Sequence, residues 1–158
     1  SETITTNGLT AVATVNSYLR LTKATIQSGN INANIGDVTF RLVSGTGTVV
    51  GHIGPRIGQT KLAPFTVPAG KTAYLMNIEA GSFNSGVGAI GTQIRLYTRT
   101  YGQIFTLLHI GEVVNGEYIF NYGFPIKITE KSDIDIRAYS SGNGTRVSAN
   151  FDVLLVDN

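Results

Sequence analysis

Hydrophobic and polar residues alternate in the C-terminal part of the chain with the two-residue period that is typical of β-strands. Within Asp133–Tyr139, the apolar positions are Ile134, Ile136 and Ala138. From Arg146 onward, apolar side chains again occupy every second position, namely Val147, Ala149, Phe151, Val153 and Leu155. Each run has one apolar and one polar face, which predicts two strands of a sheet that is buried on one side.

Asn-Gly dipeptides separate several such runs and predict tight turns, because both residues adopt positive φ angles readily. Asn143-Gly144 lies between the two C-terminal runs and predicts that they pair as a hairpin. Asn115-Gly116 separates Ile104–Val114 from Glu117–Phe124, and we expect those runs to pair as well. Asn7-Gly8 predicts a further turn near the start of the chain.

The rest of the chain is also rich in short strand patterns. Val67–Lys71 contains a Pro-Gly turn that joins two predicted strands, and Phe124-Pro125 is expected to end another. No long stretch has a helical period, although Glu130–Asp133 is compatible with a short helical turn. The further predicted strands are Tyr18–Ile26, Asp37–Val43, Thr48–Ile53, Leu62–Val67, Thr72–Ala80 and Gln93–Thr100. About ten strands at this spacing predict an all-β protein built as an antiparallel two-sheet β-sandwich.

The length of 158 residues favours one domain, residues 1–158. Gly51–Gln59 is rich in glycine and contains Pro55, so a subdomain boundary could lie near residues 54–61. We expect one two-sheet body to which Ser1–Ile53 contributes strands. Because the chain starts with Ser1 in an already alternating pattern, we also expect it to begin inside a longer polypeptide.

Composition narrows the classes of function. Charged residues make up 14% of the chain, the net charge is +2, and there is no cysteine. The absence of cysteine excludes a disulfide framework, a thiolate zinc site and a cysteine nucleophile. No stretch approaches the roughly 18 consecutive apolar residues of a membrane-spanning helix, so no membrane partner is expected.

Three patterns that could indicate chemistry lack the context that the chemistry needs. The run Gly86–Gly91 matches G-x-G-x-x-G, with Glu112 at a suitable distance, but a strand and not a helix follows it, so we interpret it as a loop. His52 and His109 are isolated, so we expect no metal site. Asp133 and Asp135 share one strand face with Arg137 and have the pattern of a solvated ladder, while Glu112 and Glu117 flank a predicted hairpin loop. We therefore expect no enzymatic activity and no cofactor.

One polar strand face carries a mixture of arginine and tyrosine. Arg95, Tyr97 and Arg99 share this face, and Tyr101 follows closely. Arginine and aromatic residues are enriched at protein interfaces. An ordinary exposed face, a glycan site and a nucleic-acid site are alternatives, and the low net charge argues against nucleic acid.

Two predicted strands are apolar on both faces. Ile104–Ile110 includes Phe105 and Leu107, and Thr72–Ala80 includes Tyr74 and Leu75. A single sandwich covers only one face of each strand, so we expect another layer, another subunit or a larger shell to cover the second face. Closed symmetric assembly is the commonest of these, which favours a homo-oligomer. The candidate interface thus consists of Arg95, Tyr97, Arg99, Tyr101, Phe105 and Leu107.

Three segments resemble recurrent stretches of virion structural proteins of tailed bacteriophages, especially short-tailed, podovirus-like phages. They are Ala63–Leu75, Phe124–Ala138 and Phe151–Asn158, with weaker similarity at Asn16–Leu21. The resemblance implies a jelly-roll-like sandwich in the virion without enzymatic activity, such as a capsid decoration (cement) or head-surface protein. It also implies a homo-oligomer, for which we expect a trimer, and partners such as the major capsid protein.

Two alternative functions stay open at this point. One is a tail or fibre component of the same kind of virion. The other is a carbohydrate-binding β-sandwich module that uses Tyr97, Tyr101 and Tyr139 as a platform, although the chain has no tryptophan.

Overall fold

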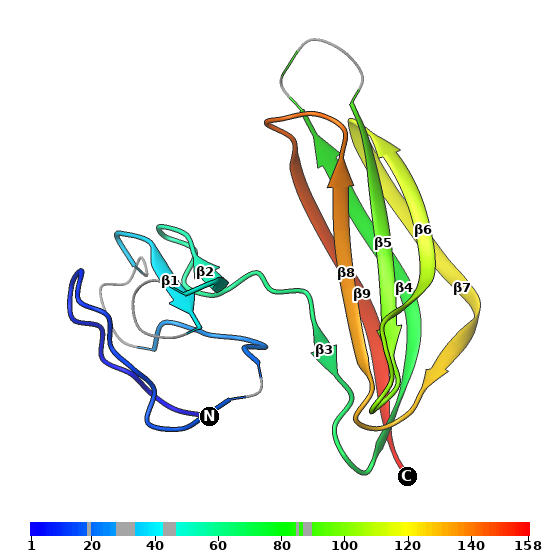
Figure 1. Cartoon of the computed structure of the whole chain (residues 1–158). Helices are drawn as coiled ribbons and strands as arrows, with labels where there is room; N and C mark the ends of the chain where they lie inside the picture. The colour runs from blue at the N-terminus through cyan, green and yellow to red at the C-terminus, as the bar shows by residue number, and fades with distance from the viewer. Residues whose placement is uncertain (19, 28–33, 43–46, 85, 87–89) are drawn as a thin grey trace. The chain divides into compact units, whose positions relative to one another are not determined.

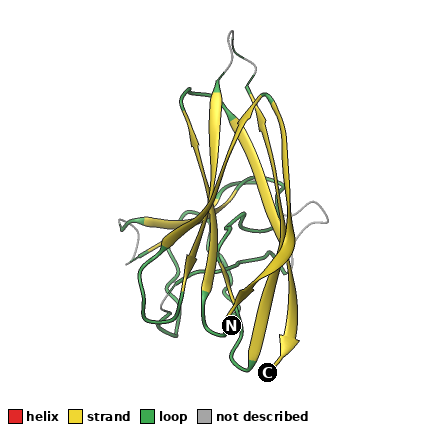
Figure 2. Ribbon diagram, turned by 90° about the vertical axis from the view of Figure 1, so that its right-hand side faces the viewer, coloured by secondary structure: helices red, strands yellow, loops and turns green. Residues whose placement is uncertain are grey.

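The computed structural model describes the chain except for residues 19, 28–33, 43–46, 85 and 87–89 (Figure 1). The chain divides into two compact units, Ser1–Leu62 and Ala63–Asn158. The described residues form strands, turns and loops and include no helix (Figure 2). The expectation of an all-β fold is confirmed. The division falls beside residues 54–61, in the region for which the sequence suggested a boundary.

The first unit contains one small antiparallel sheet, formed by β1 (Val38–Arg41) and β2 (Val49–Ile53). These two strands pair only with each other in the described part of the chain, so they do not extend the sheets of the second unit. Tyr18–Ile26 was expected to be a strand, but its described residues form a single bridge, from Thr25 to Gln59. The prediction of a strand there is wrong. An alternating sequence forms a strand only where another strand lies beside it to accept its hydrogen bonds.

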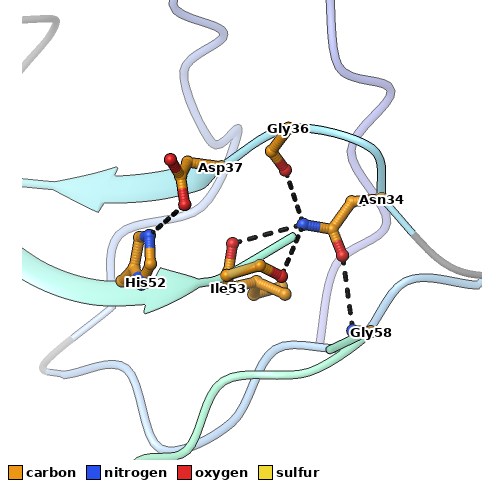
Figure 3. A network of polar contacts seen from close by, with 7 residues as sticks. Asn34, Gly36, Asp37, His52, Ile53 and Gly58 are labelled. Carbon is orange, nitrogen blue, oxygen red and sulfur yellow. Dashed lines mark hydrogen bonds and ion pairs between the residues drawn. The ribbon is translucent and has the colours of Figure 1, made fainter. Parts of the chain in front are cut away.

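Two loops of this unit are held to the end of β2 by the side-chain amide of Asn34, which is partly buried (Figure 3). Its Nδ2 lies 2.6 Å from the carbonyl oxygen of Gly36, 3.2 Å from that of Ile53 and 2.9 Å from that of Gly54, while its Oδ1 accepts from the Gly58 amide at 3.3 Å. One side chain thereby ties the end of β2 to two loops.

The second unit is an antiparallel two-sheet sandwich, as expected (Figures 1 and 2). The four-stranded sheet has the order β3-β8-β5-β6 and the three-stranded sheet the order β7-β4-β9. The strands are β3 (Phe65–Thr66), β4 (Lys71–Phe83), β5 (Gly91–Arg99), β6 (Thr106–Val114), β7 (Gly116–Ile128), β8 (Asp133–Ser140) and β9 (Arg146–Asp157). A jelly-roll fold is not confirmed, because a jelly roll has eight strands.

Alternate side chains of both sheets point between them and form the hydrophobic core. β4 contributes Ala73, Leu75 and Ile78, and β5 contributes Ile94 and Leu96, all of which are almost completely buried. β4 keeps this pattern through a bulge between Leu75 and Asn77. Because side chains alternate across a strand, the residues between these core positions point to the outside of the sandwich.

The two predicted Asn-Gly hairpins are wrong, although both turns exist. Asn115 has a φ of 42° and Gly144 a φ of 78°, as tight turns require. However, β6 pairs with β5 while β7 pairs with β4, and β8 pairs with β3 and β5 while β9 pairs with β4. Each turn carries the chain from one sheet to the other. The turn reverses the chain direction but leaves open whether the two strands pair or face each other across the core.

Other turn predictions have mixed outcomes. The turn at Asn7-Gly8 is confirmed, with the Thr10 amide donating to the Asn7 carbonyl at 2.9 Å. The Pro-Gly turn between β3 and β4 is also confirmed, with Gly70 at a φ of 76°. β7 runs through Pro125, so the predicted strand end there is wrong. This proline is tolerated because β7 is an edge strand. Glu130–Asp133 forms no helical turn, since Lys131 has a φ of 59°.

Candidate functional site

The candidate interface lies on the outer face of the four-stranded sheet. Arg95, Tyr97 and Arg99 of β5 alternate with core residues and therefore point outward. In the register with β8, Arg95 lies opposite Arg137, and Tyr97 lies opposite Asp135. The sequence predicted this face from β5 alone, whereas the structure adds the outward residues of β8.

Arginine side chains and aromatic rings stack on one another across this face. The guanidinium carbon of Arg137 lies 4.7 Å from the ring centroid of Tyr97 and 5.1 Å from that of Phe105. The guanidinium carbon of Arg99 lies 4.6 Å from the ring centroid of Phe105, so two arginines contact this ring. The guanidinium carbon of Arg95 lies 5.6 Å from the ring centroid of Tyr139. Such cation–π contacts fix the orientation of both partners. We call these six residues the arginine–aromatic face.

A buried carboxylate anchors one end of the arginine–aromatic face. Asp133 is 3% exposed and accepts hydrogen bonds from Arg99 Nε at 2.8 Å and Arg99 Nη2 at 2.5 Å. It also accepts from the Thr66 hydroxyl at 2.8 Å, which links β3 to β8. The interpretation of Asp133 as a solvated strand position is therefore wrong, because β3 and Arg99 cover it.

Hydrogen bonds to neighbouring side chains also hold the other two arginines. Arg137 Nε donates to Asp135 at 2.7 Å. Arg95 donates from Nε at 3.1 Å and from Nη2 at 2.5 Å to the side-chain oxygen of Gln93, whose own amide nitrogen donates to Glu112 at 2.9 Å. Each guanidinium is thus oriented by hydrogen bonds as well as by an aromatic ring.

The remaining candidate residues lie at the margin of this face. Leu107 of β6 lies opposite Tyr97 in the sheet and is half exposed. Tyr101 lies in the turn between β5 and β6, is 72% exposed, and has the Lys131 ammonium 5.8 Å from its ring centroid. The structure therefore brings five of the six candidates together and places Tyr101 at the end of the strands. The sequence analysis named Tyr139 only as part of the alternative glycan platform, and it missed Arg137, although β8 shows the same alternation as β5.

The two histidines occupy different environments. His52 Nε2 lies 2.6 Å from Asp37 Oδ1 on the surface of the first unit (Figure 3). His109 Nε2 lies 2.6 Å from the Tyr118 hydroxyl, and its ring centroid is 4.4 Å from that of Phe120. Burial lowers the pKa of His109. Neither histidine belongs to a cluster of three or more metal-ligating side chains among the described residues.

The G-x-G-x-x-G run lies partly outside the described residues, since 87–89 are not described. Its last residue, Gly91, begins β5, so a strand follows the run as predicted.

No described helix is long and apolar enough to cross a membrane. No family model matches the chain, and neither a curated protein nor a solved structure is significantly similar to it.

Proposed function

We propose that this chain is a non-enzymatic structural protein of a tailed-phage virion, of the kind that decorates or cements the head surface. The resemblance of Ala63–Leu75, Phe124–Ala138 and Phe151–Asn158 to such proteins motivates this proposal, and the β-sandwich is compatible with it. The arginine–aromatic face would contact another virion protein, such as the major capsid protein.

The organisation of that face is the observation that favours a protein partner. Arginine and tyrosine recur in the residues that contribute most to protein binding. Here Arg95, Arg99 and Arg137 are already held by neighbouring side chains, so binding a partner would cost little side-chain entropy. A rigid surface of this kind suits binding to the ordered surface of a capsid.

The charge balance makes nucleic acid a weaker candidate. Asp133 and Asp135 partner two of the arginines, and Glu112 is linked to the third through Gln93. Phosphate recognition relies on cationic side chains that are free to replace counterions. A glycan platform is also less favoured, because a cation lies over the ring of each of Tyr97, Tyr101 and Tyr139.

Exposed apolar residues on β6 support the proposal that the chain also assembles with itself. Leu107, Ile110 and Val114 are 50%, 47% and 53% exposed. Apolar surface that is grouped along one strand commonly marks a contact with another chain. We propose a trimer, with the number three taken from the phage resemblance.

Co-sedimentation with phage particles tests the proposed function. The full chain is mixed with empty capsids of a short-tailed phage and pelleted, alongside Arg137→Ala and the control Lys127→Ala, which alters an exposed lysine on the other sheet. We expect the wild type and the control to pellet with the capsids and Arg137→Ala to remain mostly in the supernatant. Equal capsid binding by both variants would contradict the claim that the arginine–aromatic face contacts the capsid. A wild type that does not pellet with the capsids would contradict the proposed head-decoration function.

A further inference from the structure

β9 is a long edge strand whose outer edge has no partner among the described strands. It spans twelve residues, Arg146–Asp157, and forms its ladder with β4 alone. An unpaired edge presents a row of free N–H and C=O groups that can accept another strand. Natural edge strands are usually protected by charged side chains, especially lysine, by proline, by a bulge or by a very short length. β9 contains neither lysine nor proline, and its charged residues are Arg146, Asp152 and Asp157.

The other edges of the sandwich differ from β9. β3 has only two residues, and β7 carries Pro125. β6 contains a register irregularity beside Leu107, and its inward residues Gly111 and Val113 are buried. β9 is therefore the long edge strand that has neither a proline nor a register irregularity of its own.

The inward face of β9 is also incompletely covered. Val147 lies opposite Ser82 and Ala149 lies opposite Ala80, and both Ser82 and Ala80 are buried in the sandwich. Nevertheless, Val147 is 37% exposed and Ala149 is exposed. An additional strand beside β9 would cover these two positions. β3 of the facing sheet lies near the C-terminal end of β9, because the turn after β3 leads to Lys71, the partner of Asp157. It is therefore far from Val147 and Ala149, which lie near the N-terminal end of β9.

We propose that β9 pairs with β9 of a second copy of this chain, antiparallel and about a two-fold axis at Ala149. In this register, Arg146 lies opposite Asp152 of the second copy, and the symmetry repeats the pair. Val147 likewise lies opposite Phe151 of the second copy. The two three-stranded sheets would join into one continuous six-stranded sheet.

Charge complementarity selects this register. β9 carries Arg146, Asp152 and Asp157. An axis at Asp152 would place two carboxylates opposite each other, whereas an axis at Phe151 would bring no opposite charges together. The side chain of Arg146 has no hydrogen bond or ion pair with the described residues. Asp152 is held in place, since it accepts from Asn77 Nδ2 at 2.8 Å and its amide donates to Asn77 Oδ1 at 3.1 Å.

The inference rests on the proposed self-assembly but not on binding to a virion. A contact about a two-fold axis uses the same surface on both copies, whereas a closed trimer uses two different surfaces. The β9 contact is therefore distinct from a three-fold contact, and each can form without the other.

A cysteine at Ala149 tests both the contact and its register, because the chain has no cysteine of its own. In the proposed register the two Ala149 positions lie directly opposite each other, at a Cβ separation of about 4.5–5.5 Å that a disulfide can close with a small shift. Ala149→Cys should form a cross-linked dimer under mild oxidation, seen on a non-reducing gel. The matched control Ala138→Cys, at an exposed alanine of β8, should remain mostly monomeric.

A charge-swap series tests the ion pair independently. Arg146→Asp and Asp152→Arg should each weaken the dimer in sedimentation velocity, and the double variant Arg146→Asp/Asp152→Arg should restore it. Circular dichroism of each variant verifies that the fold is retained. A wild type without even-numbered assemblies at high micromolar concentration would overturn the inference, as would equal cross-linking of both cysteine variants. Because neither experiment contains phage particles, a failure here leaves the capsid-binding result unaffected.

Discussion

The buried ion pair between Asp133 and Arg99 is expected to be the most sensitive polar contact of the sandwich. Asp133→Asn keeps the shape of the side chain but removes the charge that two Arg99 nitrogens and the Thr66 hydroxyl contact at 2.5–2.8 Å. Breaking one partner of a buried pair typically costs about 3–5 kcal/mol. Because the Arg99 side chain is 33% exposed, water can partly solvate the guanidinium that is left behind. We therefore expect a loss of about 3 kcal/mol in the free energy of unfolding.

The matched comparison is Asp135→Asn, two residues along the same strand face. The partner of Asp135 is Arg137, whose side chain is 51% exposed, so this pair should contribute at most about 1 kcal/mol. Urea unfolding followed by circular dichroism gives both free energies. If Asp133→Asn and Asp135→Asn lower the midpoint equally, the burial of Asp133 does not determine its contribution, and the reasoning from β3 coverage is wrong.

Four further predictions concern single positions. Gly111→Ala should destabilise by about 2 kcal/mol in urea unfolding, since its Cβ would lie 2.4 Å from the Tyr118 ring. Gly144→Val should cost more than about 1 kcal/mol in the same assay, because a β-branched residue is strained at a φ of 78°; an unchanged midpoint would contradict the turn geometry. Asn34→Ala should cost about 1 kcal/mol in urea unfolding, since it leaves two partly buried carbonyls without their donor. Burial lowers the pKa of His109 in the folded state, so the unfolded chain binds the proton more tightly. The free energy of unfolding should therefore keep its full value above the unfolded pKa of about 6.5 and decrease as the pH falls below it. His109→Gln should reduce the difference between urea midpoints measured at about pH 8 and about pH 5.

Strand content followed from the sequence because burial on one side of a sheet imposes a two-residue period that can be read directly. The period also predicted which residues of β5 point outward, and with them half of the arginine–aromatic face. It could not show that Arg137 stacks between Tyr97 and Phe105, since that contact depends on which strand lies beside β5. Strand neighbours are a property of the sheet order and not of the local pattern.

The burial of Asp133 illustrates a second limit. Its sequence neighbours Ser132 and Ile134 are also buried, so the alternation that marks a half-solvated strand does not hold at the start of β8. The covering residues come from β3, 67 positions earlier at Thr66, and from β5. A carboxylate at a polar position of an alternating run looks solvated in any local window. Only the long-range pairing of β3 with β8 reveals that it is an internal anchor.

The two proposed contacts use different parts of the same sandwich. The arginine–aromatic face is the outer surface of the four-stranded sheet and offers side chains whose charges are already paired. The β9 edge belongs to the other sheet and offers main-chain hydrogen-bonding groups. Pairing along an edge extends a sheet in its own plane, so it leaves the outer face of the opposite sheet uncovered. Two copies joined through β9 would thus present two arginine–aromatic faces at once, and a repeating surface such as a capsid would bind the pair more tightly than either copy alone, provided that its sites match the spacing of the two faces.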